Sequence, residues 1–460
     1  MKDRLEAEHT SDMFQQYNSR TVGAYPRVLI VNGEPIAALS ATGITLSNLF
    51  GGWPLEKLAQ VVTSSLAHEH RVAFEYQLRA DERRGLSWVR AWMDPSVKED
   101  VEATPGHTQE CGSRYIINTL RSGARKWLDL LPYELPYQIE KAIAQFRPDI
   151  VYTCLGNIQI SALALGCAKL CQVSIIPHFL DSWMSTMYAG RPDLVVQRRR
   201  LISTVQRVIG SAPVGMAISD LMAAEYTSTY GVPFHTFMNC TSVTTEMQPE
   251  SPFDPAIGPR LVYVGGLHLG RWRSLKAIGE TLACVNSEGI AGKLYVYAPA
   301  KDIGEFRDKL AGPCVEIVGS LAPHEVPDVL RAGHVMVHVE SFEKRIRRYT
   351  RLSMSTKIPQ YLAAGRPLLC YGPSEIASCR FIKDNECGLV ASSQKQSELI
   401  LALRTILSDV NLRRRLARNA WIVAQQKFDT ANVRSRFHGV IAHAVWESGI
   451  EEESLMVADH

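Results

Sequence analysis

The sequence predicts an α/β protein in which two doubly wound, Rossmann-like domains face each other. The chain has 460 residues, which is too long for one ordinary hydrophobic core. Short apolar strands alternate with helical segments in two successive blocks, a pattern typical of parallel sheets covered by helices. The densest Pro/Ser/Thr stretch of the chain, residues 241–259, separates the two blocks and is typical of a linker.

These observations divide the chain into a flexible tail (1–24), a first domain (25–245), a linker (246–259), a second domain (260–428) and a terminal helix with its tail (429–460). The composition is that of a folded protein, with 46% hydrophobic and 21% charged residues. A net charge of only +3 gives no reason to expect a nucleic-acid partner.

The cellular location follows from cysteine usage and hydropathy. The ten cysteines form no CxxC pair or metal-ligand spacing, and several lie in apolar runs, which predicts free thiols in a reducing compartment. We find no signal-peptide pattern and no apolar run of membrane-spanning length. The sequence therefore predicts a cytoplasmic protein, with at most a peripheral contact at the inner face of a membrane through the basic runs 198–200 and 344–351. It leaves the oligomeric state open.

The first block opens with a strand, a small-residue loop around Gly43 and a helix at 46–50. Its later strands are expected at 61–63, 149–153, 173–176, 214–218 and 234–239, and its helices at 137–146, 160–170 and 220–230. Residues 80–135 are irregular and rich in Trp and Arg, and we expect helical insertions there that shape an acceptor-side wall. The loop at Gly43 allows a ligand to approach the backbone closely, although it has no GxGxxG or P-loop pattern.

Two polar side chains follow the strand at 173–176. Ligands of open α/β sheets bind beyond the carboxyl ends of the strands, so His178 and Asp181 can both face a cleft. His178 can bond a sugar hydroxyl or relay a proton, and Asp181 can order an acceptor hydroxyl or a cation. The alternative is that His178 ends a strand and Asp181 caps the next helix.

The second block repeats the alternation. Strands are expected at 260–264, 293–297, 315–319, 335–339, 368–371 and 388–391, with helices ending near 285 and at 303–310, 323–331, 374–384, 397–408, 412–428 and 431–447. After its first strand, Gly265 and Gly266 allow backbone amides to approach an anion. Arg271 or Arg273, together with Lys276, can supply the charges that bind a diphosphate.

A polar turn at 353–356 precedes a short helix at 357–364 and the strand at 368–371. Ser355 or Thr356 is a good N-cap, and Gly365 is a good residue to end the helix. Hydroxyls and Lys357 in the first turn make this segment a candidate anion site. The alternative is a surface helix on which Lys357 is merely solvated.

Three segments resemble the GT-B glycosyltransferases, especially the retaining family 4. They are YVGGLHLGRWRSLK, STKIPQYLAAGRPLLCYGP and AISDLMAAEYTSTYGVPF. The resemblance covers residues 210–425 well and the first half in outline. It implies two facing domains, a terminal helix that crosses back to the first, and transfer of a sugar from a UDP- or GDP-linked donor to a saccharide or glycolipid acceptor, with retention. The cytosolic character and the basic runs, rather than the resemblance, favour bacterial surface polysaccharide synthesis as the setting.

The resemblance also implies roles for single residues. Gly43 and its neighbours would approach the donor phosphates, and His178 would lie near the reacting sugar. Lys276, Lys357 and the amides of 355–357 would stabilise the leaving diphosphate, and since no DxD motif is present we expect no metal or other cofactor.

The sequence departs from the family at its paired glutamates. Leu352 and Gln360 stand in their places. Gln360 stays a candidate donor-binding residue, and Glu340 or Glu343 is expected to contact the donor sugar. A catalytically silent scaffold remains an alternative, as does a two-domain oxidoreductase, although the dinucleotide fingerprint of the latter is missing.

Overall fold

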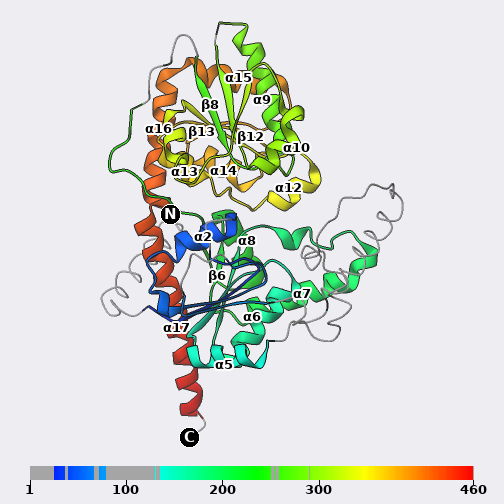
Figure 1. Cartoon of the computed structure of the whole chain (residues 1–460), viewed down its shortest axis with the longest axis vertical. Helices are drawn as coiled ribbons and strands as arrows, with labels where there is room; N and C mark the ends of the chain where they lie inside the picture. Colours follow the sequence, from blue (N-terminus) through cyan, green and yellow to red (C-terminus); the bar gives the residue numbers. More distant parts are fainter. Residues whose placement is uncertain are drawn as a thin grey trace, which may run out of the picture.

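The computed structural model describes residues 25–36, 40–66, 72–78, 130, 135–249, 253, 258–289 and 291–458, with side chains as far as 447. The expected tail at 1–24 and nearly all of the expected insertions at 80–135 lie outside these residues. The described chain forms two parallel sheets, which confirms the two-domain α/β prediction. We refer to the parts that contain them as the first and second domains (Figure 1).

The first domain is built on a seven-stranded sheet in the order β3-β2-β1-β4-β5-β6-β7. Its strands are β1 Val28–Asn32, β2 Leu58–Val62, β3 Phe74–Gln77, β4 Ile150–Cys154, β5 Ile175–Phe179, β6 Gly215–Ala217 and β7 Phe234–Thr236. Its helices are α2 Ala41–Leu49, α5 Tyr137–Phe146, α6 Ile158–Cys171, α7 Val195–Gly210 and α8 Asp220–Tyr230, with short 3-10 turns at η1 Leu55–Lys57, η4 Trp183–Ser185 and η5 Pro192–Leu194. Strands β1, β2, β4 and β5 are buried along their whole length because helices cover both faces of a parallel sheet.

The second domain contains a six-stranded sheet in the order β10-β9-β8-β11-β12-β13. Its strands are β8 Arg260–Val264, β9 Lys293–Tyr297, β10 Val315–Gly319, β11 Val335–Val339, β12 Leu368–Tyr371 and β13 Gly388–Ala391. Its helices are α9 Arg271–Asn286, α10 Ala300–Leu310, α11 Val326–Ala332, α12 Lys344–Thr350, α13 Ile358–Ala363, α14 Ala377–Asp384, α15 Gln396–Ser408 and α16 Val410–Val423. These strands match the expected positions, whereas α7 and α12 were not predicted from the sequence.

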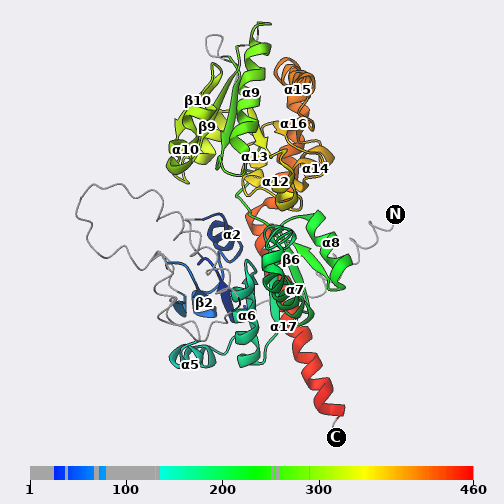
Figure 2. The same cartoon turned by 90° about the vertical axis from the view of Figure 1, so that its right-hand side faces the viewer.

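The last helix, α17 (Thr430–Ala458), returns to the first domain, as expected. It follows a π-helical turn, η6 (Ala424–Phe428), at the end of α16. In both views it runs alongside the first domain (Figures 1 and 2). Phe437 is fully buried and packs edge-to-face on Phe50, with ring centroids 4.9 Å apart. The helix therefore completes the hydrophobic core of a domain from which its own sequence is remote.

The two domains also meet along the segment that links α12 to α13. Arg351 forms a two-pronged ion pair with Glu225 of α8, with nitrogen–oxygen distances of 2.8 and 2.6 Å. Beside it, the buried Ser219 hydroxyl donates to the carbonyl of Leu352 at 2.7 Å. These contacts hold the segment against the first domain, so it forms a shared wall between the two sheets.

Candidate functional site

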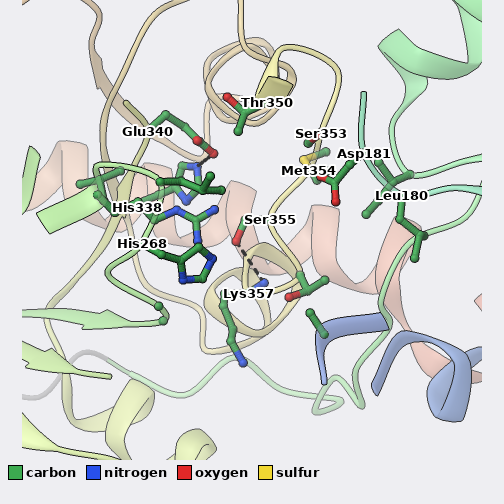
Figure 3. Close-up of a pocket in the computed structure, with 18 of the residues that line it drawn as sticks. Leu180, Asp181, His268, His338, Glu340, Thr350, Ser353, Met354, Ser355 and Lys357 are labelled. Carbon is green, nitrogen blue, oxygen red and sulfur yellow. Dashed lines mark hydrogen bonds and ion pairs between the residues drawn. The ribbon is translucent and has the colours of Figure 1, made fainter. Parts of the chain in front are cut away.

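A cavity of about 280 Å³ lies between the two domains. Leu180 and Ile218 follow β5 and β6 of the first sheet, and Gly265 and Glu340 follow β8 and β11 of the second; all four line the cavity. It therefore lies beyond the carboxyl ends of both sheets, where open α/β sheets bind ligands. Figure 3 shows Leu180 and Asp181 on one side of it and His338 and Glu340 on the other.

Arg271 is the first residue of α9, and it lines the cavity. Gly270 precedes it with φ of +72°, and a Cβ there would stand 2.9 Å from the Ser341 hydroxyl, so the turn that begins α9 requires glycine. Burial opposes the charge of Arg271, but nearby Tyr263 and Glu340 raise the pKa of the guanidinium above its usual value. The cavity thus holds a permanent cation.

The other basic candidates on α9 lie outside the cavity. Arg273 is exposed and pairs with Glu343, and Lys276 lies 3.9 Å from Glu280 on the outer face of the helix. Residues two positions apart on a helix differ in direction by about 200°, so Arg271 and Arg273 cannot both face one ligand. Arg273, Lys276 and Glu343 therefore do not line the cavity, although the sequence placed them among the donor-binding candidates, and of the two arginines it is Arg271 that does.

Glu340 is the acidic group at the end of β11, and it is 3% exposed. Burial would raise its pKa, but His338 and Arg271 outweigh that effect and hold the pKa below its usual value. The Nε2 of His338 lies 3.2 Å from its Oε1, and the hydroxyl of Ser378 donates to the same oxygen at 3.0 Å. Glu340 is therefore an ionised acceptor whose position is set by two buried neighbours.

The loop before α13 supplies a second cation. Ser355, Thr356 and Lys357 all line the cavity, as the sequence predicted for an anion site. Burial lowers the pKa of Lys357 from its usual value. Ser353 also lines the cavity and is buried, and its hydroxyl lies against the carboxylate of Asp181 from the first domain.

Gln360 does not belong to this group. Its side-chain oxygen is buried without a partner among the described residues, and the residue does not line the cavity. On α13 it lies three residues after Lys357, with the intervening Ile358 and Pro359 buried in the domain. Gln360 therefore lies outside the cavity, although the sequence placed it among the donor-binding candidates.

The glycine pair after β8 forms a tight wall of the cavity. A Cβ on Gly265 would stand 3.0 Å from the hydroxyl of Tyr263, and one on Gly266 would stand 2.5 Å from the ring of His268. The hydroxyl of Tyr263 donates to the carbonyl of Gly266 at 2.6 Å. Larger residues would displace these neighbours, so both glycines let the backbone itself border the cavity.

Asp181 is the first-domain carboxylate at the cavity. Burial raises its pKa, and the hydroxyls of Ser353 and Tyr349, which belong to the second domain, act in the opposite direction. The positive field of Arg271 also reaches it. Asp181 therefore faces groups of the other domain, and a ligand between the domains would touch both.

Gly43 contributes less than expected because the local helix begins earlier than the sequence suggested. Ser40 caps α2, and its hydroxyl accepts the Gly43 N–H at 3.0 Å, so this amide is already used. Thr42 and Thr45, which the sequence analysis did not single out, line the cavity in its place. The sequence predicts that a loop at Gly43 approaches a ligand. In the structure Gly43 lies within α2, and the residues that border the cavity there are side chains at the start of this helix.

His178 does not reach the cavity either. It lies within β5 rather than after it, and it is fully buried. One ring nitrogen lies 2.5 Å from the hydroxyl of Tyr152, and the other lies 2.9 Å from the carbonyl of Phe237. The strand runs three residues further than the sequence predicted, which buries His178 and leaves only Asp181 of this pair on the exit loop.

The burial of the His178 imidazole predicts how the free energy of unfolding depends on pH. Burial lowers the pKa of His178 to about 4, from 6.5 when it is exposed. Between these values the unfolded chain binds the proton and the folded chain does not, so stability falls as the pH drops from about 6.5 to about 4, by roughly 3 kcal/mol. Denaturant unfolding across this range should show a shallower pH slope for His178→Gln than for the wild type. Equal slopes would contradict the assignment.

Some cavity residues were missed by sequence reasoning. His338 lies two residues before Glu340 on one strand and thus on the same face, a signal that could have found it. Tyr349 and Tyr361 carried no such signal. The hydroxyl of Tyr361 donates to the carbonyl of Val264 at 2.9 Å and accepts its N–H at 2.8 Å, which fixes the end of β8 at the cavity.

The described residues contain neither a candidate metal site nor a candidate membrane span. No group of three or more His, Cys, Asp or Glu side chains among them is placed to hold a metal ion. Within the same part of the chain, no helix combines the length and apolar character needed to cross a membrane.

Comparison with known proteins identifies the fold. Residues 286–410 match the family model described as glucosyltransferase 3-like, C-terminal domain. HepE from Anabaena, solved with UDP, is 12% identical with a TM-score of 0.60, and the match covers 91% of this chain and 100% of HepE. Sucrose-phosphate synthase from Thermosynechococcus elongatus is 13% identical with a TM-score of 0.56, covering 95% and 100%.

Trehalose 6-phosphate synthase from Burkholderia multivorans is 11% identical with a TM-score of 0.54, covering 95% of this chain and 99% of that one. No curated protein sequence matches the chain. The likenesses show the GT-B glycosyltransferase fold, with a second domain like that of the glucosyltransferase 3 family.

Proposed function

We propose that the protein is a glycosyltransferase that uses a nucleotide-diphosphate sugar. The observation that carries the proposal is the convergence of Arg271 and Lys357 on one cavity between the two domains, beside the bare backbone of Gly265 and Gly266. Two cations and a glycine wall suit a diphosphate, whose charge grows as the bond to the sugar breaks. A half-buried site strengthens that stabilisation because the local dielectric is low.

In the proposed reaction the bond between the anomeric carbon and the terminal phosphate oxygen breaks, and the acceptor oxygen bonds to the same carbon. The nucleoside diphosphate leaves with the electron pair, and the acceptor hydroxyl passes its proton to the leaving phosphate oxygen. Asp181 is placed to accept a hydrogen bond from that hydroxyl, and Glu340 to accept one from a donor-sugar hydroxyl. The resemblance to family 4 supports retention of the anomeric configuration.

UDP-glucose is the donor we propose first, with GDP-sugars as the alternative. The family model that matches the second domain is named for a glucosyltransferase, and HepE has been solved with UDP-glucose. The cations Arg271 and Lys357 support catalysis without a metal. A saccharide or glycolipid acceptor in bacterial surface polysaccharide synthesis is consistent with the resemblance. The described cysteines are all free, which supports a cytoplasmic site, and a membrane contact would follow only from a glycolipid acceptor.

The test is a thermal-shift panel of UDP, GDP, ADP, TDP, their common sugar conjugates and NAD on three proteins. We expect UDP and UDP-glucose to stabilise the wild type and Lys276→Ala, an exposed lysine outside the cavity, but not Lys357→Ala. UDP release from UDP-glucose with EDTA present then tests turnover. A flat response to every nucleotide would favour the silent scaffold, and a response to NAD alone the oxidoreductase.

A further inference from the structure

Five exposed basic side chains form a surface that the proposed function does not use. We call it the basic rim; its members are Arg199 and Arg200 of α7 and Lys344, Arg345 and Arg348 of α12. Within the described part of the chain, none of them has a carboxylate partner. Their neighbours differ, since Arg347 pairs with Glu375 and Arg351 pairs with Glu225. Helices α7 and α12 contain no acidic residue at all.

The two helices belong to different domains, but they meet at η4. Arg198 in the first turn of α7 donates to the carbonyls of Met184 and Met187, which ties α7 to this turn. From the other side, the Ser185 hydroxyl donates to the carbonyl of Arg348 at 3.1 Å. In both views α12 lies at the lower edge of the second domain with α7 below it in the first domain (Figures 1 and 2). The basic rim is therefore one continuous surface.

Like charges of the two domains lie close together at the rim, where Arg348 acts on Arg198, the residue that precedes Arg199 on α7. After the effect of burial, the guanidinium of Arg348 lowers the pKa of Arg198 across the domain boundary. Placing cations from both domains against each other costs free energy that an anion between them would recover. Well-separated, solvated arginines would not change each other's pKa in this way.

The rim borders the cavity on the side of Asp181. Tyr349 and Thr350 line the cavity from the inner side of α12, whose exposed residues belong to the rim. Leu180 and Asp181 lie directly before η4. A chain that presents a hydroxyl to Asp181 would thus pass over η4 and between the two sets of arginines.

We propose that the basic rim binds the acceptor and that the acceptor is an anionic saccharide chain, with carboxylate or phosphate groups on the units that follow the reacting one. This deepens the proposed function and rests on it. A glycan chain fits better than a flat lipid surface because the cations come from both domains and border the cavity between them. The exposed Val195 and Val196, 44% and 54% accessible, lie beside Arg199 and identify the competing membrane interpretation.

The test measures binding of an oligogalacturonate, which carries one carboxylate per sugar, and of a neutral maltooligosaccharide of equal length. We expect the wild type to bind only the anionic chain, more weakly as salt rises. The double variants Arg199→Glu/Arg200→Glu and Arg345→Glu/Arg348→Glu should each weaken binding roughly tenfold or more. Arg414→Glu/Arg415→Glu, an exposed pair on the distant helix α16, is the matched control and should bind as the wild type does.

Three results would overturn the proposal: no binding of the anionic chain, equal binding of the neutral one, or an equal loss in the α16 control. Binding to phosphatidylglycerol vesicles that is abolished by Val195→Ser/Val196→Ser, without binding of the oligogalacturonate, would make the rim a membrane contact instead. The UDP thermal shift of every variant is read in parallel. A variant that keeps the UDP thermal shift has an intact fold and donor site. If the wild type shows no UDP shift, the proposed function is contradicted, and the oligogalacturonate result alone then decides whether the rim binds anionic chains.

Discussion

Replacing Arg271 with alanine is expected to abolish the stabilisation of the protein by UDP and to weaken UDP binding by a factor of about 100 or more, which is roughly 3 kcal/mol. Arg271 is the fixed cation of the cavity, and it begins α9 in a turn that glycine makes possible. Without it, the carboxylates of Asp181 and Glu340 face the incoming diphosphate with less compensation. If the protein turns over a donor sugar, kcat/KM should fall at least as far, because the leaving group carries more charge in the transition state.

The neighbouring Arg273 is the matched control. It differs from Arg271 by two positions on the same helix, but it is exposed and pairs with Glu343 outside the cavity. Arg273→Ala should therefore bind UDP within about a factor of two of the wild type, since exposed ion pairs contribute little. Isothermal titration calorimetry with UDP measures the affinity of both variants. Equal losses in the two, or a larger loss in Arg273→Ala, would mean that the diphosphate lies elsewhere on α9.

Replacing Arg366 with methionine is expected to destabilise the second domain by about 3–5 kcal/mol, because each buried carbonyl left without a donor costs about 1–3 kcal/mol and several lose theirs. Arg366 is 2% exposed, and its guanidinium donates to the carbonyls of Gly333, Arg331, Gly365, Gln248 and Pro249 at 2.9–3.2 Å. Methionine fills much of the same volume but leaves these oxygens without their donor. Two of them belong to the segment that joins the domains, so it would also lose its attachment.

Thermal unfolding measures this effect. For a domain of this size, the expected loss corresponds to a fall of about 10 °C in the melting temperature of the second-domain transition. Arg380→Met is the control, because Arg380 is exposed and pairs with Asp384 one turn away, and its transition should move little. A fall of less than about 2 °C for Arg366→Met would mean that the five carbonyls find water or other donors at little cost.

Much of the fold could be predicted from local pattern. The alternation of buried strands and helices was sufficient to assign two parallel sheets, and β12 and Gly365 lie where sequence reasoning placed them. Gly365 has φ of +62°, which a residue with a side chain rarely adopts, so its position carried a physical signal. No sequence pattern indicated helix α12, because KRIRRYT has almost no apolar face. The buried side of this helix meets the cavity and the other domain.

The site was predictable in its residue types but less so in its members. Ser355, Thr356, Lys357, Glu340 and Asp181 were all named from sequence and all line the cavity. His178 was misplaced because strand ends are uncertain by a few residues, and a shift of that size separates a buried side chain from one on the exit loop. Arg271 and Arg273 could not be separated, since helical period shows that they point apart without showing which one points inward.

By itself, the sequence determined the two-domain α/β architecture and the kinds of groups that gather at the strand ends, because periodicity and turn residues act over a few positions. Only the tertiary structure decided which of those groups share one cavity. It brought Asp181 of one domain to Ser353 of the other, and it joined α7 to α12 at η4. Such meetings depend on how two domains and a returning helix pack, and the interactions that set this packing join residues more than a hundred positions apart.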